Sequence, residues 1–329
     1  MRRRELLAAV AGSLLLSADE AIAQPAPDRR RLIVLMDQAA DNPLGLQRLT
    51  AFQRGLSALG WTSGRNVETS VRWGANSADA TRAVITGLLA LKPNVIVVAG
   101  SPAVGVLQRA THDVPIVFTS VADPVAAGFV ASMAAPGGNI TGFTVFDNSM
   151  SGKWVELLKE IQPRLAQVLV VYDPAVATGL GQLAVLQAAA AARAINVSAA
   201  NVREATEIRQ AMSAMAGQEG SGVIVTASPA GAVHKEAILA SAAEYGLPAI
   251  YPYSHFVVDG GLMSYGPDLV EPFASAAAYV DRILKGESPA SLPVQAPTKY
   301  ELFLNLKTAR ALGLQIAPSI LLRADEVIE

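Results

Sequence analysis

Cysteine is absent from the 329-residue chain, and only three histidines are present. The lack of cysteine excludes disulfides, thiol catalysis and a lipid-modified N-terminal cysteine. His112, His234 and His255 lie far apart in the sequence, without the spacing typical of a metal site. The sequence therefore predicts neither a metal ion nor another cofactor.

Charged and aromatic residues are also scarce, at 16% and 5% of the chain. The net charge is −2 and the basic residues are dispersed, so no nucleic-acid surface is indicated. Common enzyme motifs are missing as well, including Ser-x-x-Lys, Gly-x-Ser-x-Gly and the phosphate-binding Gly-x-x-x-x-Gly-Lys. We therefore expect a protein that binds a small or neutral partner and is not an enzyme.

Residues 1–23 have the pattern of a cleaved secretory signal peptide. A basic segment, Arg2-Arg3-Arg4, precedes the apolar run Leu6–Leu16, and Ala21-Ile22-Ala23 resembles a cleavage site. The apolar run is too short for a stable membrane anchor, so we expect an exported protein that is not membrane-anchored. Arg3-Arg4-Glu5-Leu6-Leu7 also fits a loose twin-arginine pattern, which leaves either export route open.

The rest of the chain alternates strands and helices in two successive series. Apolar runs such as Val95–Ala99 and Gln167–Tyr172 are typical of buried parallel strands. The alternation predicts right-handed crossovers and hence an α/β fold of two doubly wound parallel-sheet lobes, joined by a multi-strand hinge. We expect the lobes at residues 30–146 and 147–265. Residues 266–329, which include an expected helix over Pro267–Leu284, are predicted to be crossover segments returning to them.

The candidate binding site lies where two strands of the first series end. The strand Val95–Ala99 stops at Gly100-Ser101-Pro102, which predicts Ser101 as a helix N-cap and Pro102 as the first helical residue. The next strand, Pro115–Phe118, is expected to end in a polar loop that starts at Thr119. Ligands of open α/β sheets bind at the carboxyl ends of the strands, and a helix N-terminus there favours an anion. We therefore predict a site for a small zwitterion or carboxylate.

Two interpretations remain open for Ser101 and for Asp123: contact with the ligand, or a local structural role. Ser101, Ala103, Thr119 and Ser120 can offer hydroxyls and backbone N–H groups to a carboxylate, but Ser101 can also serve only as a helix cap. Asp123 either accepts an ammonium group or forms an ordinary Asp-Pro turn.

The first loop and the second series supply further candidates. Asp37 and Asp41, in the acidic loop that also holds Gln38, compete with Asp123 for an ammonium group. In the second series, aromatic residues such as Tyr253, in what we expect to be a loop over Tyr251–Phe256, suit a lid that closes over an apolar or flat ligand. The predicted ligand-binding residues are Asp37, Gln38, Ser101, Pro102, Ala103, Thr119, Ser120, Asp123, Tyr172, Asp173, Ser228, Tyr253 and Tyr265.

Several short segments, in order from about residue 30 to the C-terminus, together resemble the substrate-binding proteins of ABC transporters. The group they resemble includes tryptophan- and tyrosine-binding members. The matching segments are Gly64-Arg65-Asn66-Val67, Pro115-Ile116-Val117-Phe118, Ala122-Asp123-Pro124, Pro136-Gly137-Gly138-Asn139-Ile140-Thr141-Gly142, Ala249-Ile250-Tyr251, Gly260-Gly261-Leu262-Met263-Ser264-Tyr265-Gly266, Ile283-Leu284-Lys285-Gly286, Asn305-Leu306-Lys307-Thr308-Ala309 and Arg323-Ala324-Asp325-Glu326-Val327-Ile328.

The resemblance implies a type I periplasmic binding fold with a ligand enclosed between two lobes. It further implies a monomeric periplasmic protein that delivers a small solute, an amino acid or related carboxylate, to a membrane permease and its ATPase. Sugars and purines also suit hydroxyl-rich loops, and a sensor subunit that presents its ligand to a membrane receptor is the alternative function. A repressor would need a basic helix-turn-helix before Arg31, where the predicted signal peptide stands instead.

Overall fold

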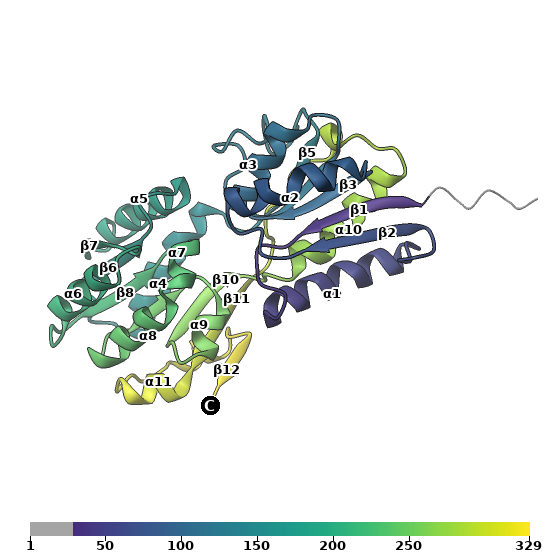
Figure 1. Cartoon of the computed structure of the whole chain (residues 1–329). Helices are drawn as coiled ribbons and strands as arrows, with labels where there is room; N and C mark the ends of the chain where they lie inside the picture. The colour runs from purple at the N-terminus through teal and green to yellow at the C-terminus, as the bar shows by residue number, and fades with distance from the viewer. Residues whose placement is uncertain (1–28) are drawn as a thin grey trace, which may run out of the picture.

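The computed structural model describes residues 29–329, which form two α/β lobes lying side by side (Figure 1). The predicted signal peptide, residues 1–23, lies outside the described residues. Among residues 29–329, no helix is both long enough and apolar enough to cross a membrane.

The first lobe is built on a five-stranded, fully parallel sheet with the strand order β2-β1-β3-β4-β5. Its two faces are covered by different helices because successive side chains of β1 point in opposite directions. Leu32 and Val34 pack with residues of α1 and α10, whereas Ile33 and Leu35 pack with residues of α2 and α3. The elements are β1 (Arg30–Leu35), α1 (Pro43–Ala58), β2 (Val67–Arg72), α2 (Ala78–Ala90), β3 (Val95–Ala99), α3 (Ser101–Ala110), β4 (Ile116–Val121), β5 (Ile140–Thr144) and α10 (Glu271–Leu284).

The second lobe contains a seven-stranded sheet with the order β12-β11-β10-β9-β8-β6-β7. All neighbouring strands are parallel except β10 and β11, which pair antiparallel. The strands are β6 (Gln167–Tyr172), β7 (Asn196–Asn201), β8 (Ser221–Val225), β9 (Ala249–Tyr251), β10 (Met263–Pro267), β11 (Tyr300–Asn305) and β12 (Glu326–Ile328). The helices are η1 (Asn148–Ser151), α4 (Gly152–Ile161), α5 (Ala177–Ala191), α6 (Ala205–Met215), α7 (Pro229–Val233), α8 (Lys235–Glu244), α9 (Ser254–Val258), η2 (Pro289–Ser291), α11 (Leu306–Ala311) and α12 (Pro318–Leu321), of which η2 lies against β5 of the first lobe.

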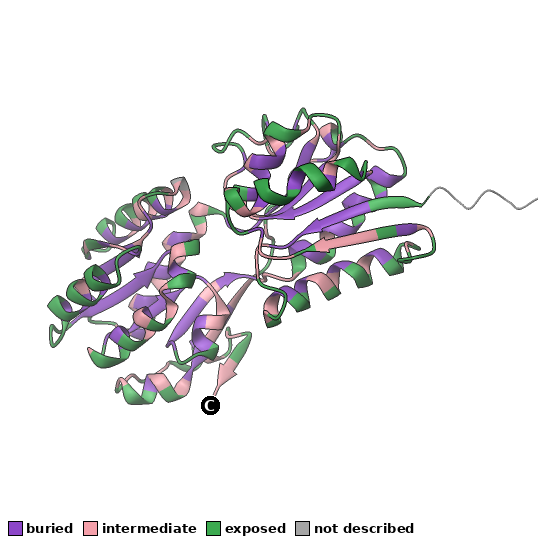
Figure 2. Cartoon of the chain, viewed as in Figure 1, coloured by how far each residue is buried: buried purple, intermediate pink, exposed green. Residues whose placement is uncertain are grey.

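Late segments of the chain return to the first lobe before the chain ends in the second. Helix α10 follows β10 of the second sheet but packs beside α1 (Figure 1), where Phe273, Ala277 and Val280 join the core of the first lobe. The chain then passes back to β11 in the second sheet. The lobes are thus connected at three places in the chain: after β5, after β10 and before β11. Buried residues concentrate in the strands, and exposed residues on the outer faces of the helices (Figure 2).

The structure confirms the α/β class but differs from the sequence prediction at two elements near the connections. We expected the late helix to begin at Pro267, whereas Pro267 ends β10 and the helix begins at Glu271. The Asp268 carboxylate accepts hydrogen bonds from the backbone N–H groups of Val270 and Glu271, and this turn delays the helix. The aromatic segment expected to be a loop contains the short helix α9.

Candidate ligand-binding site

The carboxyl ends of three neighbouring strands bring the first-lobe candidates together. Asp37 follows β1, Ser101 follows β3, and Thr119 lies in β4. The backbone N–H of Gly100 donates to the carbonyl of Thr119 at 3.0 Å. The Asp37 side chain lies over Gly100, since a Cβ atom added to that glycine would be 3.8 Å from the Asp37 Cβ.

The start of α3 corrects one of our predictions. Ser101 is the first helical residue rather than the N-cap, and Pro102 is therefore the second. Gly100 takes the cap position with φ 86°, in the left-handed region that favours glycine. Gly100 has no side chain to cap the helix, and Ser101 is half-buried at the first helical position, where its hydroxyl can face a ligand. Ala103 is buried in the core, which leaves only its backbone N–H for ligand contact.

The end of β4 is irregular at the residues we expected in a loop. The strand continues to Val121, and its register against β5 shifts between Phe118 and Val121. Ser120 has φ 56°, a left-handed conformation that serine rarely adopts. Strained backbone of this kind is concentrated at binding and catalytic sites, where the surrounding fold holds it in place.

Four buried polar atoms at this edge have no hydrogen-bond partner among residues 29–329. They are Asp37 Oδ1, Gln38 Oε1, Arg48 Nη1 and Thr119 Oγ1. Buried polar atoms are nearly always hydrogen-bonded, and a buried polar atom without a hydrogen bond lowers the free energy of unfolding by about 1–3 kcal/mol. A cluster of such atoms at the edge where α/β sheets bind ligands marks a place where a ligand can supply the missing bonds.

Arg48 is the residue that sequence reasoning missed. It lies on α1, with only 4% of its side chain exposed, and its Nη1 is 3.7 Å from Asp37 Oδ1. Its Nε donates to the carbonyl of Leu269 at 2.9 Å, and its guanidinium lies 5.2 Å from the centre of the Phe273 ring. Burial raises the pKa of Asp37, and the charge of Arg48 opposes that rise.

Tyr253 brings the second lobe to this cluster. It follows β9, is half-buried, and its ring centre is 6.4 Å from that of Phe146. Burial raises the pKa of the Tyr253 hydroxyl to about 12, with Arg48 lowering it and Asp37 raising it. Both charges belong to the first lobe, so Tyr253 is the predicted second-lobe residue that is placed near this cluster.

The remaining second-lobe candidates lie at the ends of adjacent strands. Tyr172 is the last residue of β6, Asp173 follows it, and Ser228 follows β8. The Asp173 side chain is 1% exposed; its Oδ1 accepts from Arg203 Nε at 2.8 Å, while its Oδ2 has no partner among the described residues. Gln182, which we did not predict, has an unpartnered buried Nε2 near the end of β8.

Three predicted residues make local contacts, and for Asp123 this contact is the turn that the sequence allowed as an alternative. Ser228 Oγ accepts from the N–H of Gly231 at 2.9 Å and caps α7. Asp123 Oδ1 accepts from the N–H of Ala126 at 2.9 Å and closes a turn. Tyr265 stacks on Tyr300 with ring centres 5.7 Å apart, close to the connection between the lobes.

His255, which stacks on Tyr253, makes the stability depend on pH. Burial lowers the pKa of His255 to about 4 from 6.5; Lys235 and Arg48 act in the same direction and Asp259 opposes them. Because the pKa of His255 is lower in the folded than in the unfolded protein, the unfolded protein binds a proton more readily. The contribution of neutral His255 to the free energy of unfolding is therefore fully present above pH 6.5 and is lost as the pH falls towards 4. Between pH 7 and pH 4.5 we expect the wild type to lose about 2 kcal/mol more free energy of unfolding than His255→Gln. Urea unfolding of both proteins at the two pH values measures this difference, and equal losses would contradict it.

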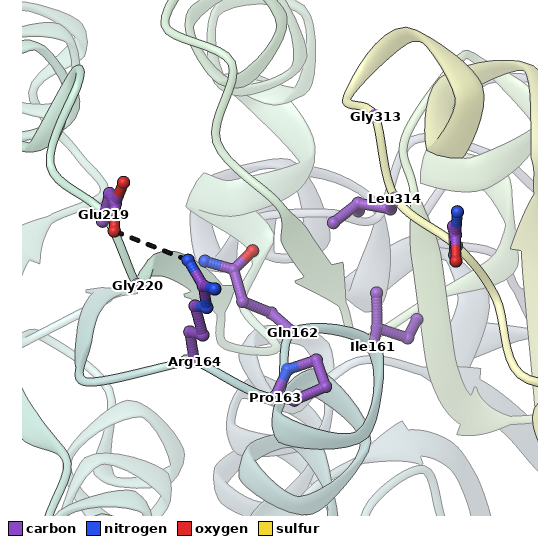
Figure 3. A pocket seen from close by; sticks show the side chains of 9 residues that line it. Ile161, Gln162, Pro163, Arg164, Glu219, Gly220, Gly313 and Leu314 are labelled. Carbon is purple, nitrogen blue, oxygen red and sulfur yellow. Dashed lines mark ion pairs between the residues drawn. The ribbon is translucent and has the colours of Figure 1, made fainter.

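A surface hollow of about 680 Å³ lies at the opposite, amino-terminal edge of the second sheet (Figure 3). Its rim carries the exposed ion pair between Arg164 and Glu219, whose nitrogen and oxygen are 3.9 Å apart. Ligands of α/β sheets bind at the carboxyl ends of the strands, so the hollow does not belong to the candidate site. The part of the chain described here also has no group of three or more acidic or histidine side chains placed to hold a metal ion.

Two α/β lobes built on mainly parallel sheets and joined by three connections define the type I periplasmic binding fold. The chain belongs to the ABC transporter substrate-binding protein family, whose model matches residues 38–328. Members of this family bind solutes and are not enzymes.

The relatives agree with this family over most of the chain. A tyrosine-binding protein of Clostridioides difficile is 26% identical over 286 residues, which cover 85% of this chain and 80% of the relative. A conserved domain protein of Vibrio cholerae is 28% identical in its crystal structure, with a TM-score of 0.80 over 91% of this chain and 99% of that one. A Streptococcus pneumoniae ABC domain in complex with L-Trp has a TM-score of 0.81 at 23% identity, over 91% of this chain and 100% of the other.

Proposed function

We propose that this protein is the periplasmic substrate-binding component of an ABC importer and that its ligand is an amino acid, with aromatic amino acids as the first candidates. The family membership supports the transport role. The names of a tyrosine-binding relative and of a tryptophan-bound structural neighbour support the ligand class. The protein acts as a monomer that delivers its ligand to a membrane permease and its ATPase.

The observation that carries the ligand assignment is the cluster of buried, unpartnered polar atoms at the edge of the first sheet. In this proposal the Asp37 carboxylate takes the ligand ammonium group. The N-terminus of α3 and the hydroxyls of Ser101 and Ser120 take the ligand carboxylate, since a helix N-terminus favours an anion. Tyr253 closes over the ligand side chain from the second lobe, supplying apolar contact and a hydroxyl.

Closure follows from the placement of these groups on both lobes. The ligand contacts the first-lobe groups and Tyr253 together only when the lobes are closed, so binding shifts the population towards the closed state. The connections between the lobes allow such a rotation without unfolding either sheet.

A thermal-shift screen of the mature protein, starting at Gln24, tests the proposal. The solutes are the amino acids, aromatic acids, sugars and nucleobases. At a hundred times the dissociation constant, a true ligand adds about 2.7 kcal/mol to the free energy of unfolding. We expect hits among the amino acids. Hits confined to sugars or nucleobases would overturn the ligand assignment, and no hit at all would count against the transport role.

Two serines at helix starts allow a matched test of the site. Ser101 is the first residue of α3 and not its N-cap, whereas Ser228 is the N-cap of α7 and its Oγ accepts from the N–H of Gly231. We expect Ser101→Ala to weaken ligand binding about tenfold with an unchanged melting temperature, because one hydrogen bond to a charged group is lost. We expect Ser228→Ala to lower the free energy of unfolding by about 1 kcal/mol, because a cap is lost. Calorimetric titration and thermal unfolding of both variants separate the two effects; a loss of stability without a loss of affinity in Ser101→Ala would refute the assignment.

A further inference from the structure

Arg48 is held in place by contacts that do not depend on Asp37. Its Nε is bonded to the Leu269 carbonyl, and its guanidinium lies against the Phe273 ring. The Nη1 atom and Asp37 Oδ1 are 3.7 Å apart, which is too long for a hydrogen bond. The two groups thus form a charge pair in which each still has an unused hydrogen-bonding atom.

The charge of Arg48 has few other partners. A buried guanidinium needs a compensating negative charge nearby. Asp268 also acts on Arg48, but more weakly than Asp37, which forms the ion pair with it at 3.7 Å. His255 faces the cluster in its neutral form at pH 7. Asp37 is therefore the main group that balances Arg48, and the pair together carries no net charge.

Asp37 is the member of the pair that faces outward. Its side chain is 26% exposed, against 4% for Arg48, so a ligand meets the carboxylate first with the guanidinium directly behind it. A ligand with only a positive charge would place a second cation beside Arg48. A ligand that carries its own carboxylate adds no net charge to the cluster. Unmatched like charges at a buried site weaken binding strongly.

We propose that Arg48 is a specificity-determining residue: paired with Asp37, it makes the site select ligands of zero net charge and reject the corresponding amines. Arg48 acts through Asp37 as a positioning residue. This inference rests on the proposed amino-acid-binding function, and it adds which charge state of a ligand the site accepts and which residue sets that preference.

The test compares three ligands of one shape and different charge. L-tryptophan is a zwitterion, tryptamine a cation and indole-3-propionate an anion; L-tyrosine, tyramine and 3-(4-hydroxyphenyl)propionate form a parallel series. Calorimetric titrations with the mature protein give the dissociation constants. We expect the wild type to bind the zwitterion of its series more tightly than either singly charged analogue.

Two variants should shift this preference in opposite directions. Arg48→Met leaves the site with one negative charge, so the affinity ratio of amine to amino acid should rise about tenfold or more. Asp37→Asn leaves one positive charge, so the ratio of carboxylic acid to amino acid should rise by a similar factor. Arg48→Lys keeps the charge and should keep the wild-type ratios. A variant that merely damages the fold lowers all three affinities together and leaves the ratios unchanged.

The outcomes separate this inference from the proposed function. Ratios in both variants within about twofold of the wild type would overturn the role of Arg48 while leaving amino-acid binding intact. If Arg48→Met fails to fold, Arg48→Gln decides in its place, because it also removes the positive charge and leaves Asp37, the proposed partner of the ammonium group, unchanged. A wild type that binds no member of either series would overturn the proposed function, and this inference with it.

Discussion

Asp37→Ala is expected to weaken amino-acid binding by about a hundredfold, equivalent to about 2.7 kcal/mol. The carboxylate is the acidic group of the cluster that faces outward, and its Oδ1 has no hydrogen-bond partner among residues 29–329. Removing it takes away the proposed partner of the ligand ammonium group and leaves Arg48 buried without its main counter-charge. Both effects oppose binding of a zwitterion. Isothermal titration with the best ligand of the screen measures the loss.

Asp41 provides the matched control for Asp37. Both acids lie in the first loop and were candidates for the ammonium group, although only Asp37 is among the predicted ligand-binding residues. Asp41 is exposed, whereas Asp37 is partly buried beside Arg48. We therefore expect Asp41→Ala to keep the wild-type affinity and to change the free energy of unfolding by less than about 0.5 kcal/mol. A loss of affinity in Asp41→Ala that equals the loss in Asp37→Ala would show that general charge, and not the contact, sets the affinity.

The regular elements could be predicted from the sequence because their patterns are strong. The strands β3 and β6 have the bounds that we expected, since Val95–Ala99 is an unbroken apolar run and Gln167–Tyr172 is apolar after its first residue. Prediction was weaker where few residues decide the structure. Helix α9 has only five residues, and its aromatic side chains give no helical period. The left-handed turn at Ser120 depends on the neighbouring strand β5 and has no local signature.

The site was predictable in position but not in its charge pair. Parallel strands bring their carboxyl ends to one edge, which located Asp37, Ser101 and Thr119 from the sequence. Arg48 was not predicted as a site residue because a single arginine on an amphipathic helix usually faces solvent. A signal did exist: the buried positions of α1 are Gly45, Arg48, Phe52 and Leu56, so helical spacing places Arg48 on the apolar face. Only the structure shows that its partner is Asp37.

Gly266 links the fold to the site through a close backbone approach. It lies in β10, next to the residue that follows β9, and a Cβ atom at this position would be 1.8 Å from the Pro252 carbonyl oxygen. Real atoms cannot approach so closely, and the obstacle is backbone rather than a flexible side chain. Any larger residue must therefore push β10 away from the Pro252 peptide. Tyr253, the residue proposed to close over the ligand, follows Pro252 in the chain, so a shift of the Pro252 peptide also displaces Tyr253.

We expect Gly266→Ala to lower the free energy of unfolding by about 3 kcal/mol and to weaken ligand binding at least about tenfold through displacement of Tyr253. Gly138→Ala is the control, because a Cβ atom there meets nothing within 4 Å and the change should be near neutral. Urea unfolding and calorimetric titration of both variants measure the two effects. Because the overlap is with the peptide that carries Tyr253, a Gly266→Ala protein that unfolds early yet binds with wild-type affinity would show that Tyr253 does not contact the ligand. A Gly266→Ala variant with wild-type stability would contradict the prediction. It would show that the Pro252 peptide can move away from the added methyl group at no cost, and that other contacts hold Tyr253 in place.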